Sequence, residues 1–140
     1  MSALDTALAM ARAGIRVHPT REKRPILAKP LDGATTDAAT IAKWWTEYPD
    51  ALPGFYPGQN GLVVVDVDEK PGKPSGSASL REAGHELPDT WSYPTPSGGR
   101  HYVYRVPEGI ELAPRDAFLP GVDLRAGNGN VVCYAKAVKL

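Results

Sequence analysis

The spacing of apolar residues predicts two amphipathic helices before residue 50. Apolar side chains recur every three or four positions in residues 2–14 and again in residues 38–48, which is the period of an α-helix. Ser2 and Asp37 precede these segments and are favoured N-cap residues. In the second helix the apolar face consists of Ile41, Trp44, Trp45 and Tyr48. We expect this face to pack in the core.

Shorter segments, bounded by glycine, proline or asparagine, predict β-strands and one more helix. The expected extended segments are residues 15–19, 51–56, 62–70, 91–93, 100–106, 121–125 and 130–134, and a short helix is expected over residues 77–86. We expect the last two extended segments to form a β-hairpin, because Gly127-Asn128-Gly129 between them favours a tight turn. Strands and helices do not alternate regularly. The pattern therefore predicts an α+β fold with a mixed, largely antiparallel sheet and flanking helices.

The segment Leu62-Val63-Val64-Val65-Asp66-Val67-Asp68 predicts a buried strand that ends in two acids. Alternate residues of a strand point to the same face, so Asp66 and Asp68 should lie together. Two carboxylates at that distance repel each other unless a cation or a shared proton compensates them. Such oxygen ligands suit Mg²⁺ or Mn²⁺. The alternative is that both acids are solvated loop residues after the strand.

Length and composition exclude several classes of protein. The chain has 140 residues, 16 basic and 16 acidic side chains, and one cysteine, Cys133. This length suits one domain, and a net charge of zero gives no general attraction to nucleic acid or membranes, so such binding needs a local patch. A lone cysteine excludes an intrachain disulfide and a multi-cysteine zinc site. Without a signal peptide or a membrane-spanning run, we expect a soluble, cytoplasmic protein.

One loop concentrates positive charge. Its basic residues are Arg21, Lys23, Arg24 and Lys29. Beside an acidic metal site, such a loop is suited to a polyphosphate or a nucleic-acid backbone. The alternative is an ordinary solvated loop.

A glycine turn precedes a strand that carries a histidine. Ser97-Gly98-Gly99 is followed directly by Arg100 and His101. Glycines have no Cβ and allow a ligand to approach the backbone, while Arg and His can donate hydrogen bonds to phosphate oxygens. His101 can instead be a core residue. The turn is thus a candidate nucleotide-binding element.

A third acid, Asp123, completes an order of motifs that resembles the bifunctional DNA primase/polymerase N-terminal family, the prim-pol branch of the archaeo-eukaryotic primase superfamily. Each motif alone is common, but together in this order they are specific. The resemblance covers nearly the whole chain, and its segments are Lys23–Pro25, Ala34–Asp37, Trp44–Trp45, Val65–Asp68, Ser97–Tyr104 and Val122–Arg125. Many relatives have Asp-x-Glu where this chain has Asp-x-Asp, which shortens one ligand and keeps its chemistry.

The resemblance implies a site and a reaction. Asp66, Asp68 and Asp123 would bind two Mg²⁺ or Mn²⁺ ions, and His101 would contact the phosphates of an incoming nucleotide. The other expected nucleotide contacts are Ser97, Gly98, Gly99, Arg100 and Arg125, and the expected contacts to a nucleic-acid backbone are Arg21, Lys23, Arg24 and Lys29. The implied reaction is template-directed nucleotidyl transfer by a DNA polymerase, with primer formation as a further activity.

The implied architecture is an RRM-like catalytic unit joined to an N-terminal helix-and-strand unit, with the active site between them. The expected partners are a DNA template and primer, with dNTPs or NTPs as substrates. Because the chain stops at Leu140, earlier than relatives do, we expect a truncated N-terminal fragment of a replication protein. As a separate expectation, this fragment is monomeric. The longer protein would add a helical segment and a helicase. It would act in the cytoplasm. If a phage or plasmid encodes it, this would be the cytoplasm of the host cell.

Two other classes of function stay open at this point. The acids could serve a metal-dependent phosphohydrolase or a nucleotide-sugar transferase. Alternatively, the chain could be a nucleic-acid-binding module without catalytic activity. Nucleotide incorporation on a primed template distinguishes the polymerase from both.

Overall fold

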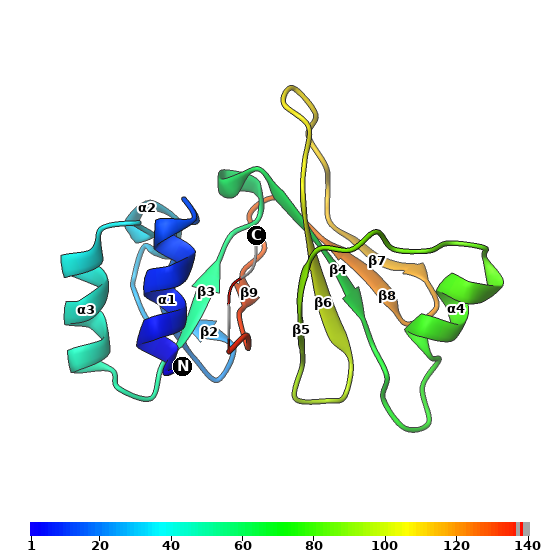
Figure 1. Cartoon of the computed structure of the whole chain (residues 1–140), viewed down its shortest axis with the longest axis horizontal. Coiled ribbons are helices and arrows are strands. Elements are labelled where there is room, and N and C mark those ends of the chain that lie inside the picture. Colours follow the sequence, from blue (N-terminus) through cyan, green and yellow to red (C-terminus); the bar gives the residue numbers. More distant parts are fainter. Residues whose placement is uncertain (137, 139–140) are drawn as a thin grey trace.

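The computed structural model describes residues 1–136 and residue 138, and it places their strands in two antiparallel sheets (Figure 1). The first sheet has the strand order β2-β1-β3-β9 and the second has the order β5-β6-β4-β8-β7. The predicted α+β class is confirmed, although the strands form two sheets and not one. No helix among the described residues is long and apolar enough to cross a membrane.

The first sheet and three helices make up the N-terminal part of the fold. Its elements are α1 (Ala3–Arg12), β1 (His18–Arg21), β2 (Arg24–Pro25), α2 (Pro30–Gly33), α3 (Ala38–Glu47), β3 (Leu52–Phe55) and the late strand β9 (Val131–Val132). Both predicted helices and both predicted N-caps are present, and Ser2 forms a capping box with Asp5. The apolar face of α3 buries Ile41 and Trp45 against the core, as expected.

The second sheet carries the acid-rich strand at its centre. Its elements are the short η1 helix (Gly58–Asn60), β4 (Leu62–Val67), α4 (Gly76–Glu82), β5 (Trp91–Pro94), β6 (Arg100–Arg105), β7 (Arg115–Leu119) and β8 (Val122–Arg125). Strand β4 lies between β6 and β8, and alternate residues such as Val64 are buried. Figure 1 shows α4 at the end of this sheet that is farthest from the first sheet.

The predicted C-terminal hairpin is wrong. Strand β8 pairs with β4 and with β7, a strand that the sequence pattern did not reveal, whereas β9 pairs with β3 in the first sheet. The turn at residues 127–129 instead carries the chain from one sheet to the other. It is held there because the Gly58 amide donates to the Gly127 carbonyl oxygen at 2.8 Å.

The strand predicted for residues 15–19 begins later and runs further. Strand β1 starts at His18 and continues past Pro19 to Arg21, while Val17 makes only an isolated bridge to Thr35. The Thr20 hydroxyl donates to the Leu52 carbonyl oxygen of β3 at 2.8 Å, which holds the strand beyond the proline.

Candidate active site

Four side chains form one row across the second sheet. Asp123 of β8 lies opposite Asp66 of β4, Asp66 lies opposite His101 of β6, and His101 lies opposite Tyr93 of β5. Residues directly opposite each other on antiparallel strands place their side chains on the same face. Two acids predicted from separate motifs therefore meet the predicted histidine on a single face of the sheet.

Asp66 is the buried centre of this row. Its side chain is 5% exposed, and its Oδ2 accepts a hydrogen bond from Arg125 Nε at 2.7 Å, while its Oδ1 lies 3.4 Å from His101 Nε2. Burial alone would raise the pKa of Asp66, but His101 and then Arg125 outweigh burial and lower the pKa below its usual value. Asp66 is therefore an ionised carboxylate although its side chain is almost entirely buried.

Asp68 follows the last residue of β4 and completes an acidic cluster. Asp66, Asp68 and Asp123 each offer a carboxylate oxygen, and these three atoms lie within 4.8 Å of one another. One oxygen of Asp123 also accepts a hydrogen bond from the Ala117 amide at 2.7 Å, which fixes that side chain. Burial, and then the charges of Asp66 and Asp123, raise the pKa of Asp68. The cluster thus holds more negative charge than its neighbours neutralise, and three such oxygens fit Mg²⁺ or Mn²⁺.

Removing the charge of Asp68 should stabilise the metal-free protein. The pKa of Asp68 is raised in the folded state, so the free energy of unfolding falls as the pH rises from the usual pKa of 3.8 through the raised value. Asp68→Asn should therefore raise Tm at about pH 7, where the penalty is complete, and leave it unchanged near pH 3, where both states are protonated. Thermal melts without divalent ions measure this.

The exposed Asp116 of β7 provides the control for this experiment. Asp116→Asn removes an acid from the same sheet without touching the cluster. An equal gain in Tm from both variants would mean that general charge, and not repulsion within the cluster, limits stability.

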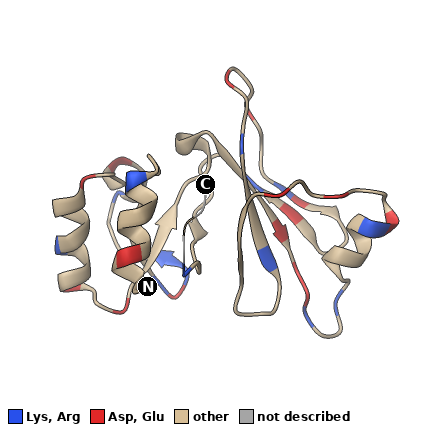
Figure 2. Cartoon of the chain, in the orientation of Figure 1, with Lys and Arg blue, Asp and Glu red and all other residues tan. Residues whose placement is uncertain are grey.

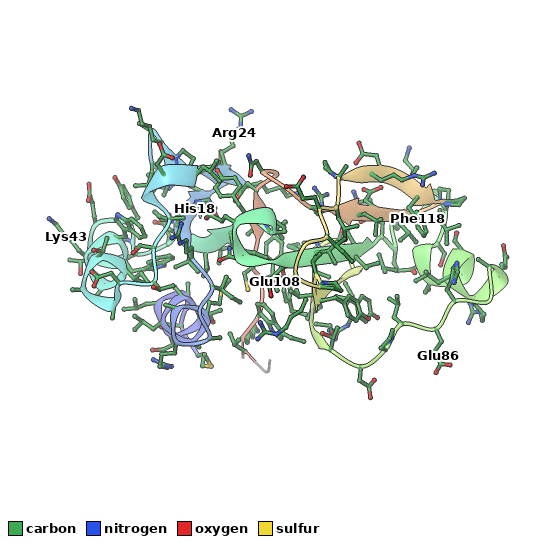
Figure 3. All side chains as sticks on the ribbon, turned by 90° about the horizontal axis from the view of Figure 1, so that it is seen from above. His18, Arg24, Lys43, Glu86, Glu108 and Phe118 are labelled. Atoms are coloured by element: carbon green, nitrogen blue, oxygen red, sulfur yellow. The ribbon has the colours of Figure 1, made fainter. Side chains whose placement is uncertain are left out.

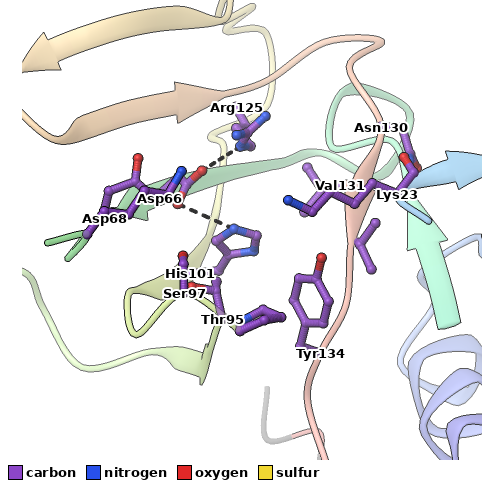
Figure 4. A pocket seen from close by; sticks show the side chains of 13 residues that line it. Lys23, Asp66, Asp68, Thr95, Ser97, His101, Arg125, Asn130, Val131 and Tyr134 are labelled. Carbon is purple, nitrogen blue, oxygen red and sulfur yellow. Dashed lines mark hydrogen bonds and ion pairs between the residues drawn. The ribbon is translucent and has the colours of Figure 1, made fainter. Parts of the chain in front are cut away.

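A pocket of ≈ 290 Å³ faces the acidic cluster, and both sheets contribute to its walls (Figure 4). Asp66, His101 and Arg125 lie on one side, and Lys23 and Tyr134 lie on the other. The remaining lining residues are Asp68, Lys70, Thr95, Pro96, Ser97, Asn130, Val131 and Val132. The pocket therefore lies between the two units, which is where the sequence places the active site.

The predicted nucleotide-binding residues do not all reach this pocket. Ser97, His101 and Arg125 line it, whereas Gly98, Gly99 and Arg100 do not. The side chain of Arg100 projects from the face of β6 opposite to that of His101, and its Nη1 donates to Ser92 Oγ at 3.2 Å. A Cβ on Gly99 would overlap the Val67 carbonyl oxygen, so close packing against β4 already requires glycine there.

Only one of the four basic residues of the predicted loop lines the pocket. Lys23 lies in a tight turn between β1 and β2 and lines the pocket. Arg21 instead pairs with Asp50 at 3.4 Å, and Arg24 and Lys29 are exposed outside the pocket. Figure 3 shows Arg24 pointing away from the molecule. Figure 2 shows the acids of β4 and β8 in the second sheet and a basic β2 in the first.

Several pocket residues were missed by sequence reasoning. Tyr134 and Asn130 flank β9, and their approach to the acids depends on the pairing of β9 with β3. Thr95 Oγ1 is buried and has no hydrogen-bond partner within residues 1–136 and 138, although it lines the pocket. A bound polar ligand would satisfy this atom. Tyr93, behind His101, was recognised only as part of an apolar segment.

Comparison with known proteins gives one finding that covers most of the chain. The family model described as bifunctional DNA primase/polymerase, N-terminal, matches residues 7–138. No curated protein matches the chain. The matched range contains the acidic cluster, His101 and both sheets.

Proposed function

Because the chain belongs to the bifunctional DNA primase/polymerase N-terminal family, a group of nucleotidyltransferases that use divalent metals, we propose that it extends DNA by template-directed nucleotidyl transfer. The observation that carries this proposal is the cluster of Asp66, Asp68 and Asp123, whose oxygens lie within 4.8 Å of one another beside a pocket with cationic walls. Neither a phosphohydrolase nor a module without catalytic activity is favoured by a further observation.

The three acids would hold two ions, Mg²⁺ or Mn²⁺. Bound there, the ions would supply activation of the primer 3′-hydroxyl and neutralisation of the triphosphate. Asp66 and Asp123 are held in register by their strands, and Asp68 extends the cluster toward the pocket. The contribution of the chain is chiefly to fix these oxygens in position.

Arg125 and His101 have a second role that follows from their contacts with Asp66. In the present structure Arg125 neutralises the Asp66 carboxylate, and His101 Nε2 lies 3.4 Å from it. Once Asp66 coordinates a cation, the N–H groups of Arg125 and His101, which face the same pocket, can donate hydrogen bonds to triphosphate oxygens. The Ser97 and Thr95 hydroxyl groups, which also line the pocket, add neutral donors. The pocket is thus suited to the triphosphate of a dNTP or an NTP, and we propose that one catalytic domain contains the whole site.

Lys23 is proposed to contact the DNA backbone next to the acids, with Arg24 and Lys29 extending this surface. Neutralising Lys23 should weaken DNA binding and lower the slope of its salt dependence by about 1, because one cation no longer faces a phosphate. Arg21→Gln should have a smaller effect, because Asp50 already neutralises Arg21. Equilibrium DNA binding at several salt concentrations measures these slopes.

The exposed Lys43 on α3 serves as the matched control for Lys23, because it lies at the outer edge of the first unit (Figure 3). Lys43→Gln should leave the slope unchanged. If Lys23→Gln leaves it unchanged as well, Lys23 belongs to ordinary solvated surface.

The direct test of the proposed function is incorporation of labelled nucleotide on a primed DNA template with Mg²⁺ or Mn²⁺. Extension that follows the template sequence supports the proposal. Release of inorganic phosphate or transfer of a sugar without extension would indicate the other enzyme classes. DNA binding that persists without incorporation, and that does not change in Asp66→Ala, would indicate a binding module.

A further inference from the structure

Asp68 lies beyond the paired part of β4, so contacts outside the sheet must hold it at the acidic cluster. Strand β4 ends at Val67, and its pairing with β6 and β8 fixes Asp66 but stops before Asp68. The carboxylate oxygens of the cluster lie within 4.8 Å of one another, and like charges at that distance repel. Without further restraint, the Asp68 side chain would turn toward solvent. The segment after β4 therefore has to hold it in place.

The backbone of Asp68 is held on both sides by glycines. Its amide donates to the Gly121 carbonyl oxygen at 2.8 Å, and its carbonyl oxygen accepts from the Gly76 amide at 2.9 Å. A Cβ on Gly76 would lie only 2.3 Å from the Gly121 carbonyl oxygen, so the close approach requires glycine there. The start of α4 thus lies directly against the end of β4 and the turn before β8.

Glu69, the second residue after β4, closes this contact with its side chain. Its Oε1 accepts hydrogen bonds from the Ser77 amide at 2.8 Å, from the Ser75 hydroxyl at 3.0 Å and from the Ser77 hydroxyl. Hydrogen bonds to an ionised oxygen are stronger than those between neutral groups. The Ser79 hydroxyl of the same helix donates to the Pro120 carbonyl oxygen, which anchors α4 to the turn before β8. Glu69 therefore links the end of β4 to an anchored helix.

Glu69 is not itself a member of the acidic cluster. Within the part of the chain that the structure describes, the acids whose oxygens come together are Asp66, Asp68 and Asp123, and Glu69 does not line the pocket. We propose that Glu69 is a positioning residue, which ties the end of β4 to the first turn of α4 and so fixes Asp68 for metal binding. The consequence for catalysis rests on the proposed function.

Glu69→Ala and Glu69→Gln test this proposal. Alanine removes the acceptor, whereas the amide oxygen of glutamine can still accept from the Ser77 amide but has no charge. The two variants therefore separate the contact from the charge. Glu82→Ala, at the exposed last residue of α4, is the matched control for loss of an acid in this region. Circular dichroism and Tm check that each variant folds.

The first measurement is Mn²⁺ binding without nucleotide, followed by the electron paramagnetic resonance signal of free Mn²⁺. Loss of a residue that orients a metal ligand weakens metal binding by about 10- to 100-fold, so Glu69→Ala should lose about 10-fold or more. Glu69→Gln should stay close to the wild-type affinity, and Glu82→Ala should match it. Equal losses in the alanine and glutamine variants would mean that the charge of Glu69 attracts Mn²⁺, which would overturn the proposal.

Two other results of this titration would also overturn it. If Glu69→Ala binds Mn²⁺ as the wild-type protein does, with or without a lower Tm, Glu69 serves only as a contact to α4. If the wild-type protein does not bind Mn²⁺, there is no ion for which Asp68 is positioned.

Ser77→Ala examines the same contact from the side of α4. It removes one donor to Glu69 and changes no charge. Mn²⁺ binding should weaken less than in Glu69→Ala, and the double variant should bind Mn²⁺ no more weakly than Glu69→Ala alone, because both changes break one link. Losses that simply add in the double variant would show that the two residues act independently, against the proposal.

The last measurement is the dependence of primer extension on Mn²⁺ concentration. The three acids remain in Glu69→Ala, so extension should need about 10-fold more Mn²⁺ and recover at saturating Mn²⁺, with little change in the KM for nucleotide. A variant that stays inactive at every Mn²⁺ concentration would give Glu69 a direct role and overturn the positioning role. If Mn²⁺ binding changes as expected but wild-type protein incorporates no nucleotide, Glu69 still positions Asp68 and the proposed function fails separately.

Discussion

Asp66→Asn is expected to reduce nucleotide incorporation to below about one hundredth of the wild-type rate. Asparagine keeps the shape of the side chain and removes its charge, so the cluster loses its most buried anion. Asp123→Asn should have a similar effect, because Asp123 lies directly opposite Asp66 on β8. Single-turnover primer extension, corrected for the folded fraction, measures both variants.

The same substitution separates catalysis from stability. Asp66 is the anion that neutralises the half-buried Arg125, so Asp66→Asn should lower Tm in metal-free buffer, whereas Asp68→Asn should raise it. A plain model of three repelling acids would predict a gain in both cases. The control is again Asp116→Asn, which should change neither rate nor Tm. Extension by Asp66→Asn at the wild-type rate would remove Asp66 from the catalytic residues.

The local parts of this architecture could be predicted from the sequence because local chemistry determines them. Ser2 and Asp37 cap helices whose apolar period is complete within a dozen residues. The run that ends in Asp66 is apolar enough to be the central strand of a sheet. Strand β7 lacks such a signal, because four of its five residues are exposed and show no alternation. Hydrophobic patterning has little to detect in a strand of this kind.

Long-range pairing accounts for the errors and for the missed residues. Gly127-Asn128-Gly129 has the composition of a hairpin turn, but the Gly58 amide and the pairing of β9 with β3 hold it as a crossing between sheets. That crossing brings Tyr134 to the pocket. Likewise, the row from Tyr93 to Asp123 depends on the register of four strands, and a shift by one residue would move a side chain to the other face. Local patterns do not determine register.

His101→Ala is expected to raise the KM for nucleotide by about 10- to 100-fold, which corresponds to the loss of one hydrogen bond to a charged group. The structure strengthens the reason for this expectation, because His101 Nε2 already points toward the acids at 3.4 Å from Asp66. His101→Gln or His101→Asn keeps an N–H donor and should recover part of the loss. Nucleotide titrations of primer extension measure the effect, and His85→Ala, at an exposed site, is the control.

Binding of Mn²⁺ without nucleotide then distinguishes two ways in which His101 could act. If His101 donates to phosphate, His101→Ala should leave Mn²⁺ affinity close to the wild-type value, because the three acids remain. If its main task is to hold Asp66, Mn²⁺ affinity should change together with KM. A variant that binds nucleotide normally and loses only stability would make His101 a core residue. Arg125, whose Nε is 2.7 Å from Asp66, would then be the first candidate for the triphosphate contact, because it lines the pocket and Arg100 and Arg105 of β6 do not.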